Sequence, residues 1–115
     1  MSEHDDAVSL RHMLDYAREA VALAQDKTRK DLENDRLLQL GLTRLMEVVG
    51  EAATRVSGET CARHPAIPWA QVVGMRTRLI HGYDVLDWDL LWDTVCDDLP
   101  PVIAQLERIL EMGPP

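Results

Sequence analysis

Apolar residues recur at intervals of three and four along most of this chain, which is the spacing that places them on one face of an α-helix. The first such stretch predicts a helix over residues 7–25, with Asp5 or Asp6 in position to cap its start. Its predicted buried face consists of Leu10, Leu14, Ala17, Val21 and Ala24. A basic run follows at residues 27–30, where the periodicity breaks, and a solvated turn is a simpler interpretation of that run than a binding site.

A second, longer stretch predicts a helix that is capped by Asn34 or Asp35 and runs to about Val56. Its apolar residues cover more than one face, so we expect it to be buried on two sides, within a bundle or against a second copy of the chain. Gly41 and Gly50 lie inside this helix. Because glycine costs about 1 kcal/mol relative to alanine within a helix, both positions are candidates for close helix contacts.

Glycine, proline and aspartate mark the later boundaries. Ser57-Gly58 predicts the end of the second helix, and residues 59–67 are expected to form a loop. A helix is then predicted over residues 69–81, with a proline before its first turn. Asp87 can cap a last helical stretch, which Pro100-Pro101 should kink or restart.

The composition agrees with helices and excludes several classes of protein. With 115 residues, 46% of them hydrophobic and none of them Phe, the chain must build an aliphatic core. Size and pattern together predict one all-α domain over residues 1–115, an up-and-down bundle of four to five main helices. Cys61 and Cys96 have no metal-binding spacing, so packing is their expected role and a reducing cytoplasm the expected location. The first residues lack the features of a signal peptide, and no stretch is long enough to span a membrane.

The net charge of −8 argues against general nucleic-acid binding, for which a basic surface supplies most of the affinity. The acidic residues lie mostly toward the two ends of the chain. The middle of the chain instead contains Arg44, Arg55, Arg63, Arg76 and Arg78. A dimer that brought two such middle regions together would have a local basic cleft.

The densest chemistry lies in residues 74–83, which hold two arginines, a histidine and a tyrosine. Arginine has a fixed charge and five donors for phosphate oxygens, and histidine can take and give a proton near neutral pH. The pattern Arg76-x4-His81-x-Tyr83 therefore indicates phosphate binding together with proton transfer. In a straight helix, at about 100° per residue, His81 would point roughly 140° away from Arg76. We therefore expect the site at a helix end, where Gly82 redirects the chain.

Other polar and aromatic residues have simpler interpretations than catalysis. His64 lies in the expected loop, where a histidine is more often structural or solvated than catalytic. Trp88 and Trp92 lie four positions apart, which favours packing in the core or a dimer over stacking on bases. Glu51 is expected to face solvent, with an orienting contact to an arginine as the alternative. Arg78 suits an ion pair or a partner contact as well as nucleic acid.

Six short segments are spread along nearly the whole chain. Each is a weak family signal by itself, but their order and spacings are specific when the six are taken together. They are Gly50-Glu51-Ala52-Ala53, His64-Pro65-Ala66-Ile67-Pro68-Trp69, Gly74-Met75-Arg76, Leu79-Ile80-His81-Gly82-Tyr83, Leu91-Trp92 and Leu99-Pro100. In this order the chain resembles the HepT-like toxins of the HEPN ribonuclease superfamily. It differs from their usual motif at Thr77, where the family commonly has Asn, so a hydroxyl replaces an amide.

The resemblance implies a small all-helical homodimer that cleaves RNA without a metal or another cofactor, with its active site near the dimer interface. Arg76 and His81 would be the catalytic residues, and Thr77 and Tyr83 would support them. The implied partner is a minimal nucleotidyltransferase antitoxin, which transfers AMP from ATP to Tyr83 and so silences the ribonuclease. Two alternatives are a non-catalytic binding partner of a nucleotidyltransferase and a structural dimer in which the motif only caps and packs.

Overall fold

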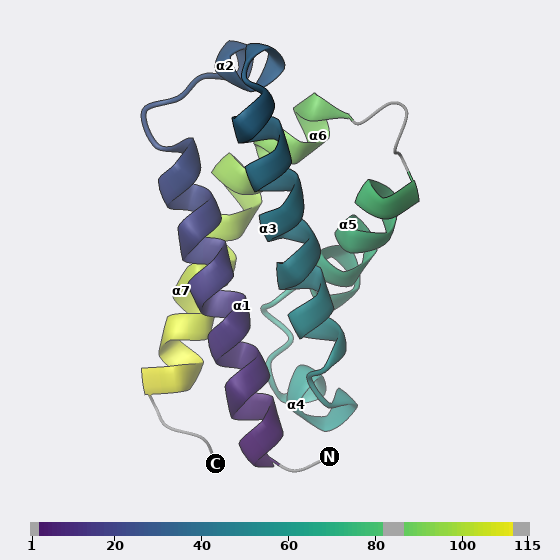
Figure 1. Cartoon of the computed structure of the whole chain (residues 1–115). Helices are drawn as coiled ribbons and strands as arrows, with labels where there is room; N and C mark the ends of the chain where they lie inside the picture. Colours follow the sequence, from purple (N-terminus) through teal and green to yellow (C-terminus); the bar gives the residue numbers. More distant parts are fainter. Residues whose placement is uncertain (1–2, 82–86, 112–115) are drawn as a thin grey trace.

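The computed structural model describes residues 3–81 and 87–111, with the side chains of residues 3–5, 76 and 79–81 left out. All regular structure in these two ranges is helical, which confirms the all-α prediction (Figure 1). The elements in chain order are α1 (Glu3–Ala24), α2 (Arg29–Asn34), α3 (Arg36–Thr54), α4 (Gly58–Arg63), α5 (Trp69–His81), α6 (Trp88–Asp93), the π-helical segment η1 (Thr94–Asp98) and α7 (Leu99–Glu111).

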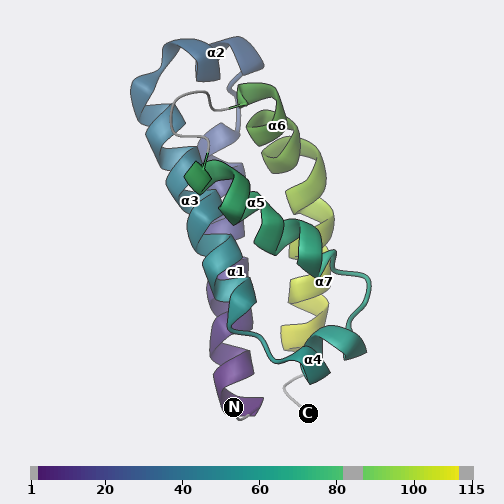
Figure 2. The ribbon, with the colours of Figure 1, turned by 90° about the vertical axis from the view of Figure 1, so that its right-hand side faces the viewer.

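Helix α3 is the centre of the bundle. Asp35 caps its start, as predicted, because its side chain accepts a hydrogen bond from the Leu38 backbone N–H at 3.1 Å. The helix packs against α1 on one side and against α5 on another (Figure 2). Contact on two sides buries more of α3 than a single face, although Leu37 and Leu40 remain exposed. The buried set is Leu38, Leu42, Met46, Val49, Gly50, Ala52 and Ala53.

Helix α1 runs antiparallel to α3 along its length (Figure 1). Its buried apolar face is Leu10, Met13, Leu14, Ala17, Ala20 and Ala24. The two helices are in close contact beside Gly41, where a Cβ atom would lie 2.9 Å from Cδ2 of Leu23. The prediction of a close helix contact at Gly41 is therefore confirmed.

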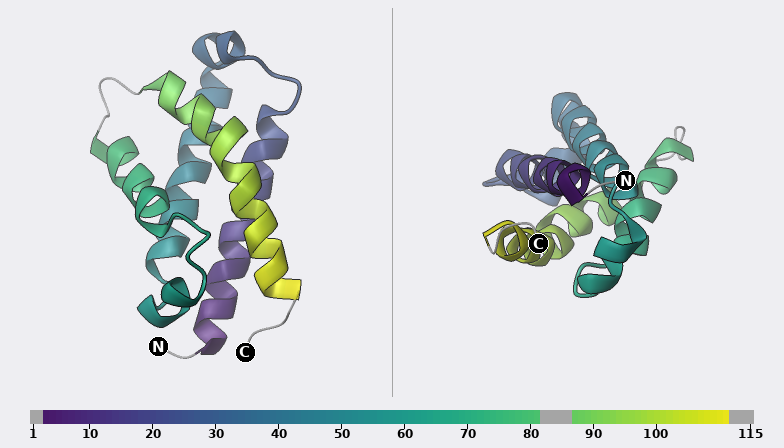
Figure 3. Two further views of the ribbon diagram at one scale, coloured as in Figure 1. Left: turned by 180° about the vertical axis from the view of Figure 1, so that it is seen from behind. Right: turned by 90° about the horizontal axis from the view of Figure 1, so that it is seen from below.

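The last three elements form one continuous, curved helix behind this pair (Figure 3). Pro100 and Pro101 have no N–H to donate to the carbonyl groups four residues earlier. In the segment just before the prolines, the backbone hydrogen bonds span five residues and not four. The Leu99 N–H donates to the carbonyl of Thr94. The kink that the two prolines predicted thus takes the form of the π-helical segment. Beyond it, Leu99, Val102 and Leu106 are buried as α7 packs against α1.

The loop predicted over residues 59–67 is partly wrong, because α4 occupies its first half. Ser57 starts this short helix by accepting a hydrogen bond from the Thr60 backbone N–H at 3.3 Å. The preceding helix has already ended at Thr54. Ser57 therefore begins one helix and does not stop the other. A single turn of helix has too few apolar positions to produce a periodic pattern.

The predicted capping role of Asp6 is also wrong, because α1 already begins at Glu3. Asp6 is buried inside the helix and joins it to α4. Its carboxylate accepts hydrogen bonds from the Ser57 N–H at 2.9 Å, from Ser57 Oγ at 2.6 Å and from Thr60 Oγ1 at 2.6 Å. Burial by itself raises the pKa of Asp6, but these hydrogen bonds outweigh burial and hold the pKa below its ordinary value.

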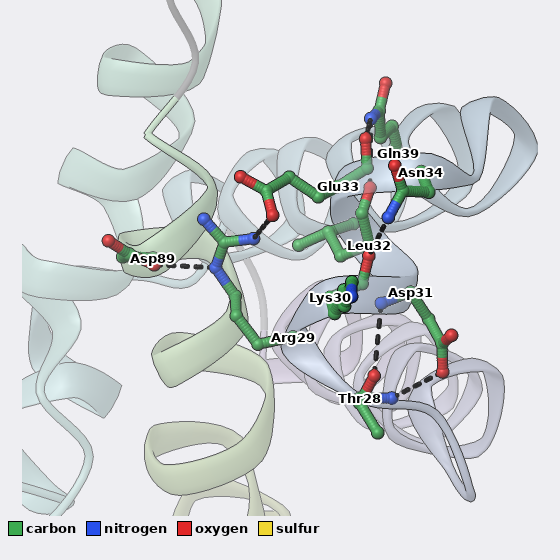
Figure 4. A network of polar contacts seen from close by, with 9 residues as sticks. All are labelled: Thr28, Arg29, Lys30, Asp31, Leu32, Glu33, Asn34, Gln39 and Asp89. Atoms are coloured by element: carbon green, nitrogen blue, oxygen red, sulfur yellow. Dashed lines mark hydrogen bonds and ion pairs between the residues drawn. The ribbon is translucent and has the colours of Figure 1, made fainter.

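The basic run at residues 27–30 is only partly a turn, since α2 begins at Arg29. A capping box starts the helix: Thr28 Oγ1 accepts from the Asp31 N–H at 3.1 Å, and the Asp31 carboxylate accepts from the Thr28 N–H at 2.8 Å (Figure 4). Arg29 donates through Nε to Asp89 on α6 at 2.6 Å. This ion pair and the buried Leu32 fasten α2 over the end of the bundle.

Aromatic and sulfur side chains divide between the core and the surface. Trp88 and Trp92 are partly buried against the core, so their predicted packing role is confirmed. Cys61 packs there as well, whereas Cys96 is exposed and its predicted packing role is wrong. None of the helices in the two described ranges is long and apolar enough to cross a membrane.

Candidate active site at the end of α5

Arg76 and His81 lie in the second half of α5, which the structure describes as far as His81. The backbones of Arg76 and His81 both belong to this helix. Their side chains lie outside what the structure describes, and so do Gly82 and Tyr83. Arg76 and His81 are thus located by their backbones, within the last two described turns of one helix.

Buried side chains on one face of α5 fix its position. Val72 and Met75 are buried, at 9% and 2% exposed, and the helix packs against α3. At its start the Trp69 indole N–H donates to the His64 carbonyl at 3.0 Å. These contacts orient the helix, so the direction in which its C-terminal end points is set by the core.

The same end of α5 is open to solvent. Thr77 and Arg78 are both exposed. Arg78 makes no ion pair with another residue in the described ranges, so the ion pair considered for it is not seen there. An RNA strand or a protein partner could approach this surface without displacing the core.

Two further candidates from the sequence have structural contacts of their own. His64 is half-buried at the end of α4. Its backbone N–H donates to the Cys61 carbonyl at 3.2 Å, and its backbone carbonyl accepts from the Trp69 indole N–H. Glu51 faces Arg55 at 3.4 Å across one helical turn, which is the orienting contact considered as the alternative for it. Neither contact reaches the end of α5.

Across residues 3–81 and 87–111, no cluster of three or more His, Cys, Asp or Glu side chains is arranged to hold a metal ion. Both cysteines are free thiols. Burial and the neighbouring Asp6 carboxylate raise the pKa of the Cys61 thiol, which keeps it protonated and poorly reactive.

Fold and sequence together define a class: small helical bundles with an Arg-x4-His-x-Tyr motif whose Arg76 and His81 lie on one helix. The family model for ribonuclease HepT-like proteins matches residues 13–109. The chain belongs to this HepT-like ribonuclease family.

The curated relatives cover nearly the whole chain. A "probable ribonuclease HepT" of Thermococcus cleftensis is 32% identical, over 88% of this chain and 96% of its own length. A "putative RNase" of Methanocaldococcus jannaschii is 29% identical, over 95% of this chain and 100% of its own. Another "putative RNase", from Caldanaerobacter subterraneus, is 28% identical, over 89% of this chain and 91% of its own. No solved structure matches the chain.

Proposed function

We propose that this protein is a metal-independent RNA endonuclease toxin that works as a homodimer in the cytoplasm. The observation that supports the proposal most directly is the placement of the Arg76 and His81 backbones on the second half of α5, a helix that the core holds at Val72 and Met75 and whose Thr77 and Arg78 are exposed. Membership of the HepT-like ribonuclease family gives these two residues their expected chemistry.

RNA provides its own nucleophile, the ribose 2′-hydroxyl, so the enzyme has only to move protons and stabilise negative charge. One histidine takes the proton of the 2′-hydroxyl, whose oxygen then attacks the adjacent phosphorus. The bond from phosphorus to the 5′-oxygen breaks, and that oxygen receives a proton. The products are a 2′,3′-cyclic phosphate and a free 5′-hydroxyl. Arg76 would bind the non-bridging oxygens through two parallel N–H donors as their charge grows.

A dimer would supply the second proton-transfer group. If the ends of two α5 helices face the same cleft, the His81 of one protomer can act as the base while the other acts as the acid. Two copies of Arg76 would also raise the local positive charge, which a chain of net charge −8 otherwise lacks. The active site would then lie near the dimer interface.

Tyr83 is the proposed point of control. In the transfer, its phenolic oxygen attacks the α-phosphorus of ATP on a minimal nucleotidyltransferase antitoxin, and pyrophosphate leaves. The AMP group adds bulk and negative charge two residues from His81, so it would both block the RNA and compete for Arg76. Thr77, exposed on the same helix, is proposed to support the site through its hydroxyl.

Two features of the sequence favour a second candidate, a non-catalytic binding partner of a nucleotidyltransferase. Thr77 replaces an amide that the motif usually contains, and the net charge of −8 weakens RNA binding. This candidate keeps the modification of Tyr83 but requires no cleavage of RNA.

RNA cleavage by the purified chain in EDTA distinguishes the two candidates. The first predicts fragments that end in a 2′,3′-cyclic phosphate, and lower activity in Arg76→Lys because a lysine cannot bind phosphate through two parallel donors. Incubation with ATP and a cognate nucleotidyltransferase should add the mass of AMP and stop cleavage, and Tyr83→Phe should prevent both effects. A folded chain that gains AMP but never cuts RNA would contradict the first candidate and support the second.

A further inference from the structure

A polar groove of about 270 Å³ runs between α1 and α3, away from the motif. Residues from both helices line it at helical spacing, and the ones that carry chemistry are His12, Tyr16, Arg44, Glu51 and Arg55. Figure 1 shows α1 and α3 side by side with α5 on the other side of α3. The groove and the end of α5 are thus separated by one helix.

The groove is more basic than the chain as a whole. Two guanidinium groups and one carboxylate line it, whereas the whole chain has a net charge of −8. Arg44 is exposed and forms no ion pair with any residue that the structure describes. Arg55 faces Glu51 at 3.4 Å, but its side chain is 65% exposed, so the guanidinium can turn toward an incoming anion.

The α1 side of the groove has two rings. His12 and Tyr16 lie one helical turn apart, with ring centroids 6.3 Å apart and planes tilted by 54°. Tyr16 is 38% exposed, whereas the three described tryptophans are partly buried against the core. Exposed rings next to arginines are the combination that binds single-stranded nucleic acid, since the bases stack and the phosphates pair with the charges.

We propose that this groove binds single-stranded RNA, with phosphates at Arg44 and Arg55 and a base against Tyr16 and His12. The inference rests on the proposed function, because it extends the contact of the RNA substrate beyond the end of α5. A strand that crosses the exposed side of α3 could occupy both places. The groove would then supply affinity, and the motif would supply the chemistry.

RNA binding by the full-length His81→Ala protein tests the proposal without interference from cleavage. The probe is a fluorescein-labelled single-stranded RNA of about 20 nucleotides, and fluorescence anisotropy is measured at several salt concentrations. Tyr16→Ala should weaken binding about fivefold or more because a stacked base is lost, whereas Tyr16→Phe should bind like the parent. Arg44→Gln should weaken binding about fivefold and lower the slope of log affinity against log salt by roughly 0.7.

Arg11→Gln is the matched control. Arg11 is also exposed, stands on the same helix beside His12 and does not line the groove, so the substitution removes the same charge outside the site. Arg11, Tyr16 and Arg44 are all exposed, and circular dichroism should show that substituting them leaves the helix content unchanged. Equal affinity in Arg11→Gln and Arg44→Gln, or no RNA binding by the parent protein, would overturn the proposal.

Two further measurements identify another occupant if there is one. If Arg44→Gln weakens binding of ATP but not of RNA, the groove is a site for a free nucleotide, and the proposal fails. If the substitution weakens capture of the purified nucleotidyltransferase and leaves RNA affinity unchanged, the groove is a protein contact, and the proposal fails as well. Cleavage of RNA by the wild-type protein is scored separately, so failure of the groove leaves the active-site proposal standing.

Discussion

The α1–α3 pair and the C-terminal end of α5 use the same secondary structure for different purposes. Along α1 and α3 the buried side chains interlock over the length of both helices, from Met13 and Ala17 on one to Leu42 and Val49 on the other. Helix α5 is buried at Val72 and Met75, but Thr77 and Arg78 beyond them are exposed. One region stabilises the fold, and the other holds exposed polar residues at a fixed position.

This difference predicts that stability and activity can be changed separately. Substitutions inside the α1–α3 interface should lower the free energy of unfolding, and they should lower cleavage only in proportion to the fraction of unfolded protein. Substitutions in the motif should leave unfolding nearly unchanged and remove activity.

Leu42→Ala should produce the largest loss, about 2–5 kcal/mol of unfolding free energy, because Leu42 is fully buried at the centre of α3. Urea unfolding followed by circular dichroism measures the change. Leu37→Ala, on the same helix but 80% exposed, serves as the control and should change stability by less than about 0.5 kcal/mol. Similar losses for both variants would mean that the assigned buried face of α3 is wrong.

Asp6→Asn should cost about 1–3 kcal/mol at neutral pH, because a carboxylate that accepts three hydrogen bonds becomes an amide with only one acceptor oxygen. The pH dependence should change too. The pKa of Asp6 in the fold is lower than its ordinary value of 3.8, so the ionised group stabilises the protein above about pH 4. This stabilisation is lost as the pH falls through the lower pKa of the folded state.

Urea unfolding at several pH values below 5 measures this acid-dependent part. The loss of stability on acidification should be smaller in Asp6→Asn than in the wild type. Asp15→Asn, at an exposed position of the same helix, should lose as much stability on acidification as the wild type does. An unchanged acid dependence in Asp6→Asn would show that other carboxylates account for it.

Gly41→Ala should stabilise the protein by about 0.5–1 kcal/mol, since alanine is the better helix former. The new methyl group would meet Leu23 Cδ2 at 2.9 Å, but this atom is the end of a flexible side chain that is 39% exposed and can turn away. Thermal unfolding with Gly74→Ala as the comparison tests this, because Gly74 has no neighbour within 4 Å of an added Cβ. A destabilised Gly41→Ala would show that α1 and α3 cannot adapt even at their exposed edge.

Arg29→Gln should have the smallest effect, less than about 1 kcal/mol, although its 2.6 Å contact with Asp89 is the closest link between α2 and α6. The Asp89 side chain is 79% exposed, so water can replace most of the interaction. Arg18→Gln, which breaks a 2.6 Å pair with Glu107, should behave similarly. A loss of more than about 2 kcal/mol for Arg29→Gln alone would give α2 a larger part in the core than its single buried residue, Leu32, suggests.

The long helices could be predicted from the sequence because a buried face repeats over many turns. The periodic apolar residues of α1 and α3 identified their buried faces, and the Asp35 cap identified where α3 begins. The short helices α2 and α4 were missed because six residues provide too few repeats. Asp6 looked like a cap because its partners, Ser57 and Thr60, are distant in sequence.

The motif could be predicted from the sequence, but the groove could not. The helix that carries Arg76 and His81 followed from the pattern of residues 69–81, and the motif residues were identified by their chemistry. The groove between α1 and α3 was not foreseen, since it joins residues from two helices. His12 and Tyr16 could have been noticed as neighbours at a spacing of four, but polar residues at that spacing usually form an ordinary solvated face.

The most direct test compares wild type and His81→Ala in two assays on the same samples: RNA cleavage in EDTA and urea unfolding. The proposed chemistry predicts that cleavage falls about 100-fold or more while the unfolding midpoint stays the same. Equal cleavage by both proteins would contradict the assignment of His81 as the proton-transfer group. A parallel fall in cleavage and stability would contradict the separation between the α1–α3 interface and the end of α5.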